Sequence, residues 1–256
     1  FHQLEALIDS QDPDIICFQE TKVHNDDFPF ESLKNLGYEI IINGQKGHYG
    51  VATFYRGDLV SSSIGFKNDP EDAQCRLITS THKLKKGELT CINGYFPQGE
   101  SRDHPTKFPY KKKFFEDLMS HLNENFSKEQ NIIILGDLNI SPQDIDIGIG
   151  ENNRKRWLQT GKCSFLPEER EWLQKIKDWG FKDSYRKFYP ESNEKFSWFD
   201  YRSRGFDDSP KRGLRIDHLW VTESLLDMAE GANIDYEIRG MEKPSDHAPV
   251  WTEFNF

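Results

Sequence analysis

Short apolar runs that end in a carboxylate or an amide recur along this chain, and they constrain its fold more than any other feature. Three such runs are Ile16-Cys17-Phe18-Gln19-Glu20, Ile134-Leu135-Gly136-Asp137-Leu138-Asn139 and Leu214-Arg215-Ile216-Asp217, and a fourth polar group, Ser245-Asp246-His247, directly precedes another run. Short apolar runs are typical of buried strands. Because a rigid sheet presents polar groups to solvent at its strand ends, the sequence predicts one polar site assembled from several strands.

The periodicity of the rest of the chain predicts more strands than helices. Helices are expected over residues 1–8, 110–125, 152–158 and 168–179, and strands over 15–18, 38–43, 50–55, 75–81, 89–95, 131–135, 214–221, 233–239 and 248–254. Two clusters of strands, each accompanied by helices, indicate the α/β class, specifically a four-layered α/β sandwich of two packed mixed β-sheets flanked by helices.

The bulk composition favours a single globular domain spanning residues 1–256. Hydrophobic residues make up 36% and charged residues 30% of the chain. No apolar run approaches the roughly 20 residues that a membrane span needs. The four cysteines form no C-x-x-C pair, so we expect them to be reduced, which favours a cytoplasmic location.

The net charge of −10 is unusual for a protein that binds nucleic acid. A metal-dependent phosphodiesterase, however, concentrates carboxylates at its site, and bound cations invert the local field. The basic residues are also clustered, at Lys107 with Lys111–Lys113, at Arg154–Arg156, and at Lys211-Arg212 with Arg215. Each cluster alone is more typical of a solvated face than of a phosphate track, so the overall charge decides nothing.

The side chains at the predicted strand ends suit a hard divalent cation. Mg²⁺ prefers oxygen ligands and takes one or two carboxylates plus water and substrate phosphate, whereas zinc sites use His and Cys. Glu20, Asp137, Asn139 and Asp246 supply such oxygens. Phosphodiester hydrolysis also needs a group that deprotonates or orients water, and stabilisation of the charge on phosphate.

Each of these residues also has an ordinary structural interpretation. A Glu at a strand end is common, Gly-Asp-x-Asn can be a simple turn, and the Asp or Ser of Ser-Asp-His can cap one. Asp217 is harder to dismiss, because an unpaired carboxylate between apolar neighbours is costly to bury. The four sites together favour a metal-dependent phosphodiesterase.

The same strings resemble the motif series of the endonuclease/exonuclease/phosphatase superfamily. They are Gln19-Glu20-Thr21-Lys22, Gly136-Asp137-Leu138-Asn139, Arg215-Ile216-Asp217 and Ser245-Asp246-His247. Longer strings resemble the exonuclease III branch of that superfamily: residues 46–52, 93–99, 154–165 and 196–203. The resemblance runs along essentially the whole chain.

The resemblance implies a role for each matched residue. Glu20 would hold the metal with Asp246 in its environment, and Asp137, Asn139 and His247 would also lie at the metal. Asp137 would donate or accept a proton, and Asn139 would steady the transition state. Tyr95 would contact the phosphate, and Asp217 would orient His247, which faces that phosphate.

The resemblance also implies the ligands. Mg²⁺ is the expected cofactor, with Mn²⁺ as a possible substitute, and double-stranded DNA is the expected partner, especially abasic sites and 3′ ends. The expected DNA-contacting residues are Arg76, Gln98, Arg154, Lys155, Trp198, Leu214 and Ile216. Of these, Trp198, Leu214 and Ile216 match the positions of a small apolar pocket that admits a flipped deoxyribose, although they also suit an ordinary core.

The expected function is DNA repair by 3′-to-5′ exonuclease action on duplex DNA, incision 5′ to abasic sites, and removal of 3′-blocking groups including phosphate. A monomer without a nucleotide cofactor is expected. The family normally begins with a further strand that carries an Asn, and we expect that this strand is absent from the sequence given, which starts at Phe1. Two alternatives remain: a phosphoinositide or sphingolipid phosphodiesterase of the same superfold, and a catalytically silent DNA-binding module.

Overall fold

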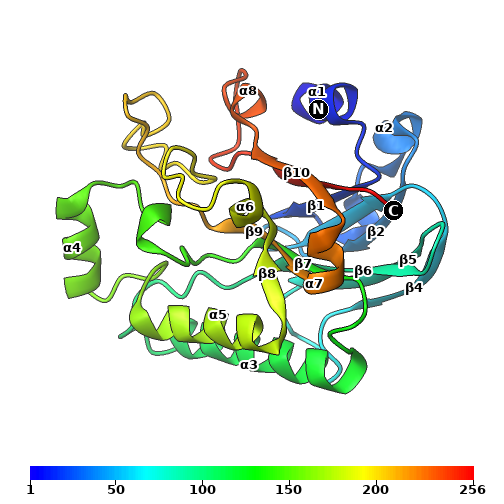
Figure 1. The fold of residues 1–256 in the computed structure, drawn as a ribbon, viewed down its shortest axis with the longest axis horizontal. Helices are drawn as coiled ribbons and strands as arrows, with labels where there is room; N and C mark the ends of the chain where they lie inside the picture. The colour runs from blue at the N-terminus through cyan, green and yellow to red at the C-terminus, as the bar shows by residue number, and fades with distance from the viewer.

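The computed structural model describes residues 1–256 and places two layers of strands between outer layers of helices (Figure 1). The helices are α1 (His2–Gln11), α2 (Phe30–Leu33), α3 (Lys107–Asn125), α4 (Glu151–Gln159), α5 (Pro167–Trp179), α6 (Ser184–Phe188), α7 (Glu223–Asp227) and α8 (Tyr236–Arg239). The strands are β1 (Ile15–Gln19), β2 (Glu39–Asn43), β3 (Val51–Tyr55), β4 (Leu59–Ile64), β5 (Leu77–Lys83), β6 (Glu88–Tyr95), β7 (Ile132–Asp137), β8 (Phe181–Asp183), β9 (Asp217–Thr222), β10 (Ala229–Ile234) and β11 (Val250–Phe254).

The larger layer is a six-stranded sheet in the order β4-β5-β6-β7-β9-β8. It is mixed, because β6 and β7 run parallel while the other neighbours run antiparallel. Helices α3 and α5 cover its outer face (Figure 1), and the apolar stripe Phe114, Leu118 and Leu122 of α3 is buried there, as the helical spacing predicts. The main core of the protein therefore lies between this sheet and these two helices.

The second layer consists of two separate hydrogen-bonded sheets, β1-β3-β2 and β10-β11. Helices α1, α2 and α8 lie outside this layer (Figure 1), and Leu4, Leu7 and Ile8 of α1 pack on the cluster around Phe54. Strands β1 and β11 are not hydrogen-bonded to each other, and a cavity of about 1070 Å³ lies between them. Apolar side chains of both layers line most of this cavity, and Glu20, Asp137, Asp217 and His247 line it as well.

The predicted α/β sandwich of packed sheets flanked by helices is confirmed, and most expected elements lie within a few residues of their observed bounds. The six-stranded sheet is mixed as expected, whereas the two sheets of the second layer are antiparallel throughout. The strand expected over residues 233–239 overlaps the observed strand only at its first two residues, 233 and 234. Strand β10 ends at Ile234, and Asp235 accepts a hydrogen bond from the Ile238 backbone N–H to begin α8. Strands β4 and β8 and the short helices α2, α6 and α7 were not anticipated. None of the helices has both the length and the apolar character required to cross a membrane.

Candidate active site

Three polar side chains stand side by side at the ends of adjacent strands of the six-stranded sheet. Tyr95 on β6 is in register with Asp137 on β7, and Asp137 is in register with Asp217 on β9. One residue earlier, Gly94 pairs with Gly136, which has a φ of 124°. A Cβ on Gly136 would lie 2.1 Å from the Gly94 carbonyl oxygen, so only glycine permits this close approach of the two strands beside the site.

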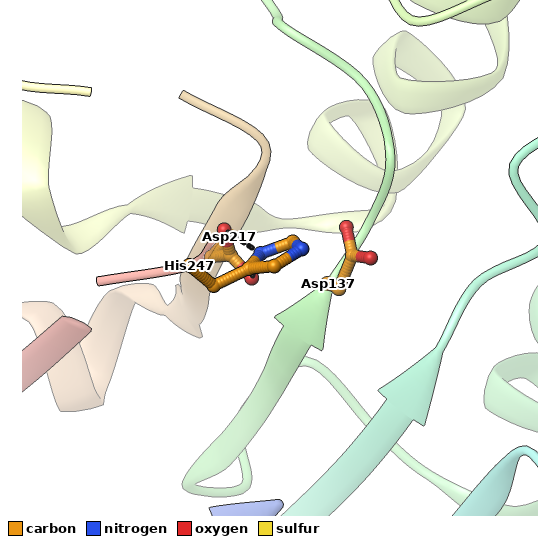
Figure 2. Close-up of side chains that lie close together, drawn as sticks. All are labelled: Asp137, Asp217 and His247. Atoms are coloured by element: carbon orange, nitrogen blue, oxygen red, sulfur yellow. Dashed lines mark hydrogen bonds and ion pairs between the residues drawn. The ribbon is translucent and has the colours of Figure 1, made fainter. Parts of the chain in front are cut away.

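His247 reaches this row of side chains from the segment before β11 (Figure 2). Its Nδ1 lies 3.0 and 2.9 Å from the two carboxylate oxygens of Asp217, so a proton on Nδ1 is donated to that carboxylate. The other ring nitrogen faces Asp137 in Figure 2. One ligand atom from each of Asp137, Asp217 and His247 lies within 4.8 Å of the others. The expected pairing of Asp217 with His247 is thus present in the geometry.

Asn139 is tied to Asp137 by two hydrogen bonds. Its backbone N–H donates to Asp137 Oδ1 at 2.9 Å and its amide Nδ2 donates to Asp137 Oδ2 at 2.8 Å. The same amide nitrogen also donates to the Phe96 carbonyl at 3.0 Å, so both of its N–H groups are engaged. Asn139 adopts a left-handed backbone with a φ of 54°, which Asn tolerates better than most residues. The loop that follows β7 therefore holds both carboxylate oxygens of Asp137.

The electrostatics of the buried pair of carboxylates and the histidine are strongly perturbed. Burial and then the negative charge of Asp217 raise the pKa of Asp137 well above its usual range. For His247, burial lowers the pKa, but the charge of Asp217 and its hydrogen bond outweigh burial and raise that pKa to about 10. His247 is therefore a cation at neutral pH, placed between two carboxylates.

Glu20 lies at the other side of the site, directly after β1, and is more exposed than Asp137. Its side chain is 41% exposed, and it receives a short hydrogen bond from the Tyr95 hydroxyl and an ion pair of 3.0 Å from Lys22. Burial opposes ionisation, but the hydrogen bonds of Tyr95 and Lys22 prevail and lower the pKa of Glu20. Glu20 is therefore ionised at neutral pH and available to a cation.

The donor set suits a hard divalent cation. Carboxylate oxygens predominate, and the mutual repulsion that helps to raise the pKa of Asp137 is what a bound cation would relieve. The compact three-residue group contains Asp137 and His247 from the expected ligands, together with Asp217, which was expected to act only through His247. Because His247 is protonated, the oxygens of this group that suit a cation belong to Asp137 and Asp217. Asp246, by contrast, accepts a hydrogen bond from the Trp198 indole N–H at 3.1 Å.

The residues expected to form an apolar pocket lie in one cluster next to these side chains. Leu214 and Ile216 are 1% and 3% exposed and pack with Phe165, while the half-buried Trp198 lies against them. The backbone of Trp198 bridges both Leu214 and His247. In this conformation Leu214 and Ile216 are covered, so a ligand arriving from solvent would meet Trp198 first.

The other expected DNA contacts differ widely in exposure. Arg76 is only 6% exposed; its guanidinium lies over the rings of Tyr49 and Tyr95, 4.0 and 4.7 Å from their centroids. Gln98 is exposed in the loop after β6. On α4, which projects from the body of the protein in Figure 1, Arg154 pairs with Asp144 and the exposed Lys155 pairs with Glu151.

Sequence reasoning missed three residues that contact these side chains. Lys22 forms an ion pair with Glu20. Its position in the string Gln19-Glu20-Thr21-Lys22, two residues after Glu20, could have indicated this contact. Tyr49 stacks on Arg76, and nothing but its place in the string 46–52 pointed to it. Lys111 was expected in a solvated basic cluster, but it is fully buried and donates to the Asn139 carbonyl, which no local pattern indicates.

Comparison with known proteins agrees with this geometry. The family model described as the Endonuclease/Exonuclease/phosphatase family matches residues 1–247. Exodeoxyribonuclease III of Haemophilus influenzae is 56% identical over 253 residues, which cover 99% of this chain and 94% of that protein. The solved 3′-5′ exonuclease NExo of Neisseria meningitidis is 35% identical with a TM-score of 0.88, covering 100% of this chain and 94% of that one.

An AP endonuclease from Archaeoglobus fulgidus is similar to the same extent in structure. It has a TM-score of 0.88 at 31% identity and covers 100% of this chain and 94% of its own. A family model that matches nearly the whole chain, together with relatives above 30% identity over nearly their full length, leaves one conclusion. This chain belongs to the endonuclease/exonuclease/phosphatase family.

Proposed function

We propose that this protein is a DNA-repair nuclease that hydrolyses phosphodiester bonds at the site formed by Tyr95, Asp137, Asp217 and His247. Relatives named exodeoxyribonuclease III, DNA repair nuclease and AP endonuclease, and a related 3′ phosphatase solved with a product DNA hairpin, support this function. The observation that carries the proposal is the buried Asp137, held by Asn139 and placed within 4.8 Å of the cationic His247. The protein is a hydrolase whose family depends on divalent metal ions.

We further propose Mg²⁺ as the physiological metal, with Mn²⁺ as a substitute. Glu20 and Asp246 would hold it, with Asp137, Asn139 and His247 adjacent. The ionised state of Glu20 supports this assignment, because a hard cation binds a carboxylate and not a carboxylic acid. When bound, such a cation neutralises charge on a phosphate oxygen.

The protein's own residues would divide the remaining work. Asp137, with its raised pKa, is suited to exchange a proton with the water or the leaving oxygen. Cationic His247, oriented by Asp217, would stabilise negative charge on the phosphate, and Asn139 would steady the transition state through the hydrogen bonds with which it holds Asp137. The Tyr95 hydroxyl, next to Glu20, would contact the phosphate.

Double-stranded DNA is the proposed substrate, with abasic sites and 3′ ends preferred. Trp198, Leu214 and Ile216 form an apolar cluster next to His247 that would accept a sugar lacking its base. Gln98, Arg154 and Lys155 would contact the DNA backbone. Arg76, whose guanidinium stacks on the rings of Tyr49 and Tyr95, would also contact the DNA. We propose a single-domain monomer that needs no nucleotide cofactor and works in the cytoplasm, where its four free cysteines would stay reduced.

The test uses purified protein and end-labelled duplexes that differ at one position. One duplex carries a single abasic site, one is intact, and one ends in a 3′-phosphate. Each is incubated with Mg²⁺, with Mn²⁺ and with EDTA. Metal-dependent incision 5′ to the abasic site, together with 3′ trimming and phosphate release, is the expected result. DNA binding without cleavage in any metal would indicate a silent binding module, and hydrolysis of phosphoinositide or sphingomyelin instead of DNA would overturn the choice of substrate.

A further inference from the structure

A buried lysine on α3 lies behind the loops that carry the active-site residues. Lys111 and Glu169 of α5 are both 0% exposed, and their charged atoms are 2.5 Å apart. The Lys111 ammonium also donates to the carbonyl of Gln98 at 3.2 Å and to the carbonyl of Asn139 at 2.9 Å. An ammonium has three N–H donors, so all three are used.

The partner carboxylate is equally well satisfied. Glu169 Oε1 accepts from Lys111, while Glu169 Oε2 accepts from the backbone N–H groups of Ser164 and Leu166 at 2.9 and 2.8 Å. Burying such a pair gains little stability over apolar residues of the same size, because desolvation offsets the attraction between the charges. The pair therefore calls for an explanation other than stability.

The two carbonyls that Lys111 binds belong to the two loops that leave the active-site strands. Gln98 lies three residues after Tyr95 on β6, and Asn139 lies two residues after Asp137 on β7. The loop at Gln98 packs closely on the lysine, since a Cβ on Gly99 would lie 2.9 Å from Lys111 Cδ. One ammonium group therefore fixes the separation of both loops.

Asn139 has particular need of such support. Its left-handed φ of 54° is less favourable than a helical or extended backbone even for Asn, so contacts that hold its carbonyl help to keep this conformation. The bond from Lys111 to the Asn139 carbonyl is such a restraint, and Asn139 in turn holds both oxygens of Asp137.

We propose that Lys111, anchored by Glu169, is a positioning residue for catalysis: it holds Asn139, and through it Asp137, in the geometry that hydrolysis requires. This inference rests on the proposed roles of Asn139 and Asp137. Lys111 itself, fully buried, touches neither metal nor DNA.

The test compares the double variant Lys111→Met/Glu169→Gln with the wild type. The double variant removes both charges and keeps an oxygen for the N–H groups of Ser164 and Leu166, whereas Lys111→Met alone would leave a carboxylate buried without its partner. We expect kcat on abasic duplex to fall about 10- to 100-fold, the range of a modest misplacement of reacting groups, with KM and DNA affinity changed less than about twofold. The ¹H–¹⁵N signal of the Asn139 side-chain amide, identified by its loss in Asn139→Ala, should shift.

Two further variants make the outcome decisive. Glu169→Gln, which leaves Lys111 bound to the two carbonyls without its anchor, should give a smaller loss of kcat. Lys175→Met, at an exposed position of α5, should change neither kcat nor the side-chain amide signal of Asn139. A loss of thermal stability with unchanged kcat and an unchanged Asn139 signal would overturn the inference and leave a purely structural pair. An inactive wild type would instead overturn the proposed function, so the two failures are distinguishable.

Discussion

The two strand layers contribute to the active site in different ways. In the six-stranded sheet, Tyr95, Asp137 and Asp217 lie on β6, β7 and β9, which are neighbours in the sheet and are joined by continuous backbone hydrogen bonding. Asp137 is only 5% exposed. In the second layer, Glu20 follows β1 and His247 precedes β11, two strands that are not hydrogen-bonded to each other and that flank the cavity.

This difference separates two kinds of task. Proton transfer needs reacting atoms placed to a fraction of an ångström, which a continuous sheet backed by packed helices provides. Binding an exchangeable cation and a long, variable polymer tolerates, and benefits from, side chains on less constrained segments. If this division holds, substitutions in the six-stranded sheet, and of His247 which Asp217 of that sheet orients, should reduce kcat, whereas substitution of Glu20 should mainly change the metal requirement.

The largest effect is expected for Asp137→Asn. The amide keeps the shape of the side chain but cannot accept a proton, so kcat should fall about 10³-fold, within the range of general acid–base catalysis. Affinity for an uncleaved abasic duplex in Ca²⁺ should change little. Single-turnover kinetics and fluorescence anisotropy measure the two quantities, with Asp178→Asn at an exposed position as control. Equal losses in binding and turnover would assign Asp137 to DNA or metal binding instead.

His247→Gln should rank second, with a fall in kcat of about 10²-fold, because an oriented cation next to the phosphate is lost. Asp217→Asn removes the charge that keeps His247 protonated and should have an effect of similar size. Since the two residues act as one unit, the double variant should be little worse than either single variant. If the losses of kcat in the two single variants multiply in the double variant, Asp217 and His247 act independently, which would contradict the pairing seen in Figure 2.

Much of this arrangement was predictable from local patterns. The apolar runs before Glu20 and Asp137 located β1 and β7 correctly, and helical spacing located α3 and α5, because period and burial are properties of a few neighbouring residues. The run before Asp217 was expected to be part of a strand, but Asp217 is the first residue of β9. The order of strands within the sheet was not predictable in this way, since it depends on contacts between distant segments.

The errors have physical causes. The strand expected over residues 233–239 was wrong beyond residue 234 because the Asp235 side chain caps a helix there, and a capping residue overrides the apolar pattern that follows it. Lys111 was assigned to a solvated cluster because burial of a lysine depends on a carboxylate 58 residues further along the chain. The expected DNA contact of Arg76 stays a prediction, but the stacking of its guanidinium on Tyr49 depends on packing that sequence spacing does not reveal.

Glu20→Gln tests the second layer and should have a smaller effect on kcat. The neutral amide is a weaker ligand for a hard cation, so the Mg²⁺ concentration giving half-maximal rate should rise about tenfold, while kcat at saturating Mg²⁺ stays within about threefold. A metal titration of the cleavage rate separates the two parameters. An unchanged Mg²⁺ requirement would remove Glu20 from the metal site, and a large loss of kcat at saturating metal would place it with the proton-transfer residues.

The last prediction concerns the stability of the six-stranded sheet and not the rate of hydrolysis. His218, next to Asp217 on β9, is buried, lies 2.9 Å from the Ile140 carbonyl through Nε2, and accepts from Arg215 through Nδ1 at 3.0 Å. Burial and the neighbouring Arg215 charge lower its pKa from 6.5 to about 4. Between these values the unfolded chain binds a proton that the folded chain does not, so this contribution to stability is complete above pH 6.5 and is lost as the pH falls towards 4.

His218→Gln should therefore lose less stability between pH 7.5 and pH 4.5 than the wild type, by at most about 3 kcal/mol for a shift of this size. Urea unfolding at the two pH values measures the difference, and His48→Gln at an exposed position controls for a general effect of removing a histidine. The ladder that orders Asp137 and Asp217 would then depend on an uncharged imidazole directly behind it. Equal acid losses in His218→Gln and the wild type would mean that the protonation of His218 does not limit the stability of the six-stranded sheet. The difference in rigidity between the two strand layers would then have to be explained by backbone hydrogen bonding and helix packing alone.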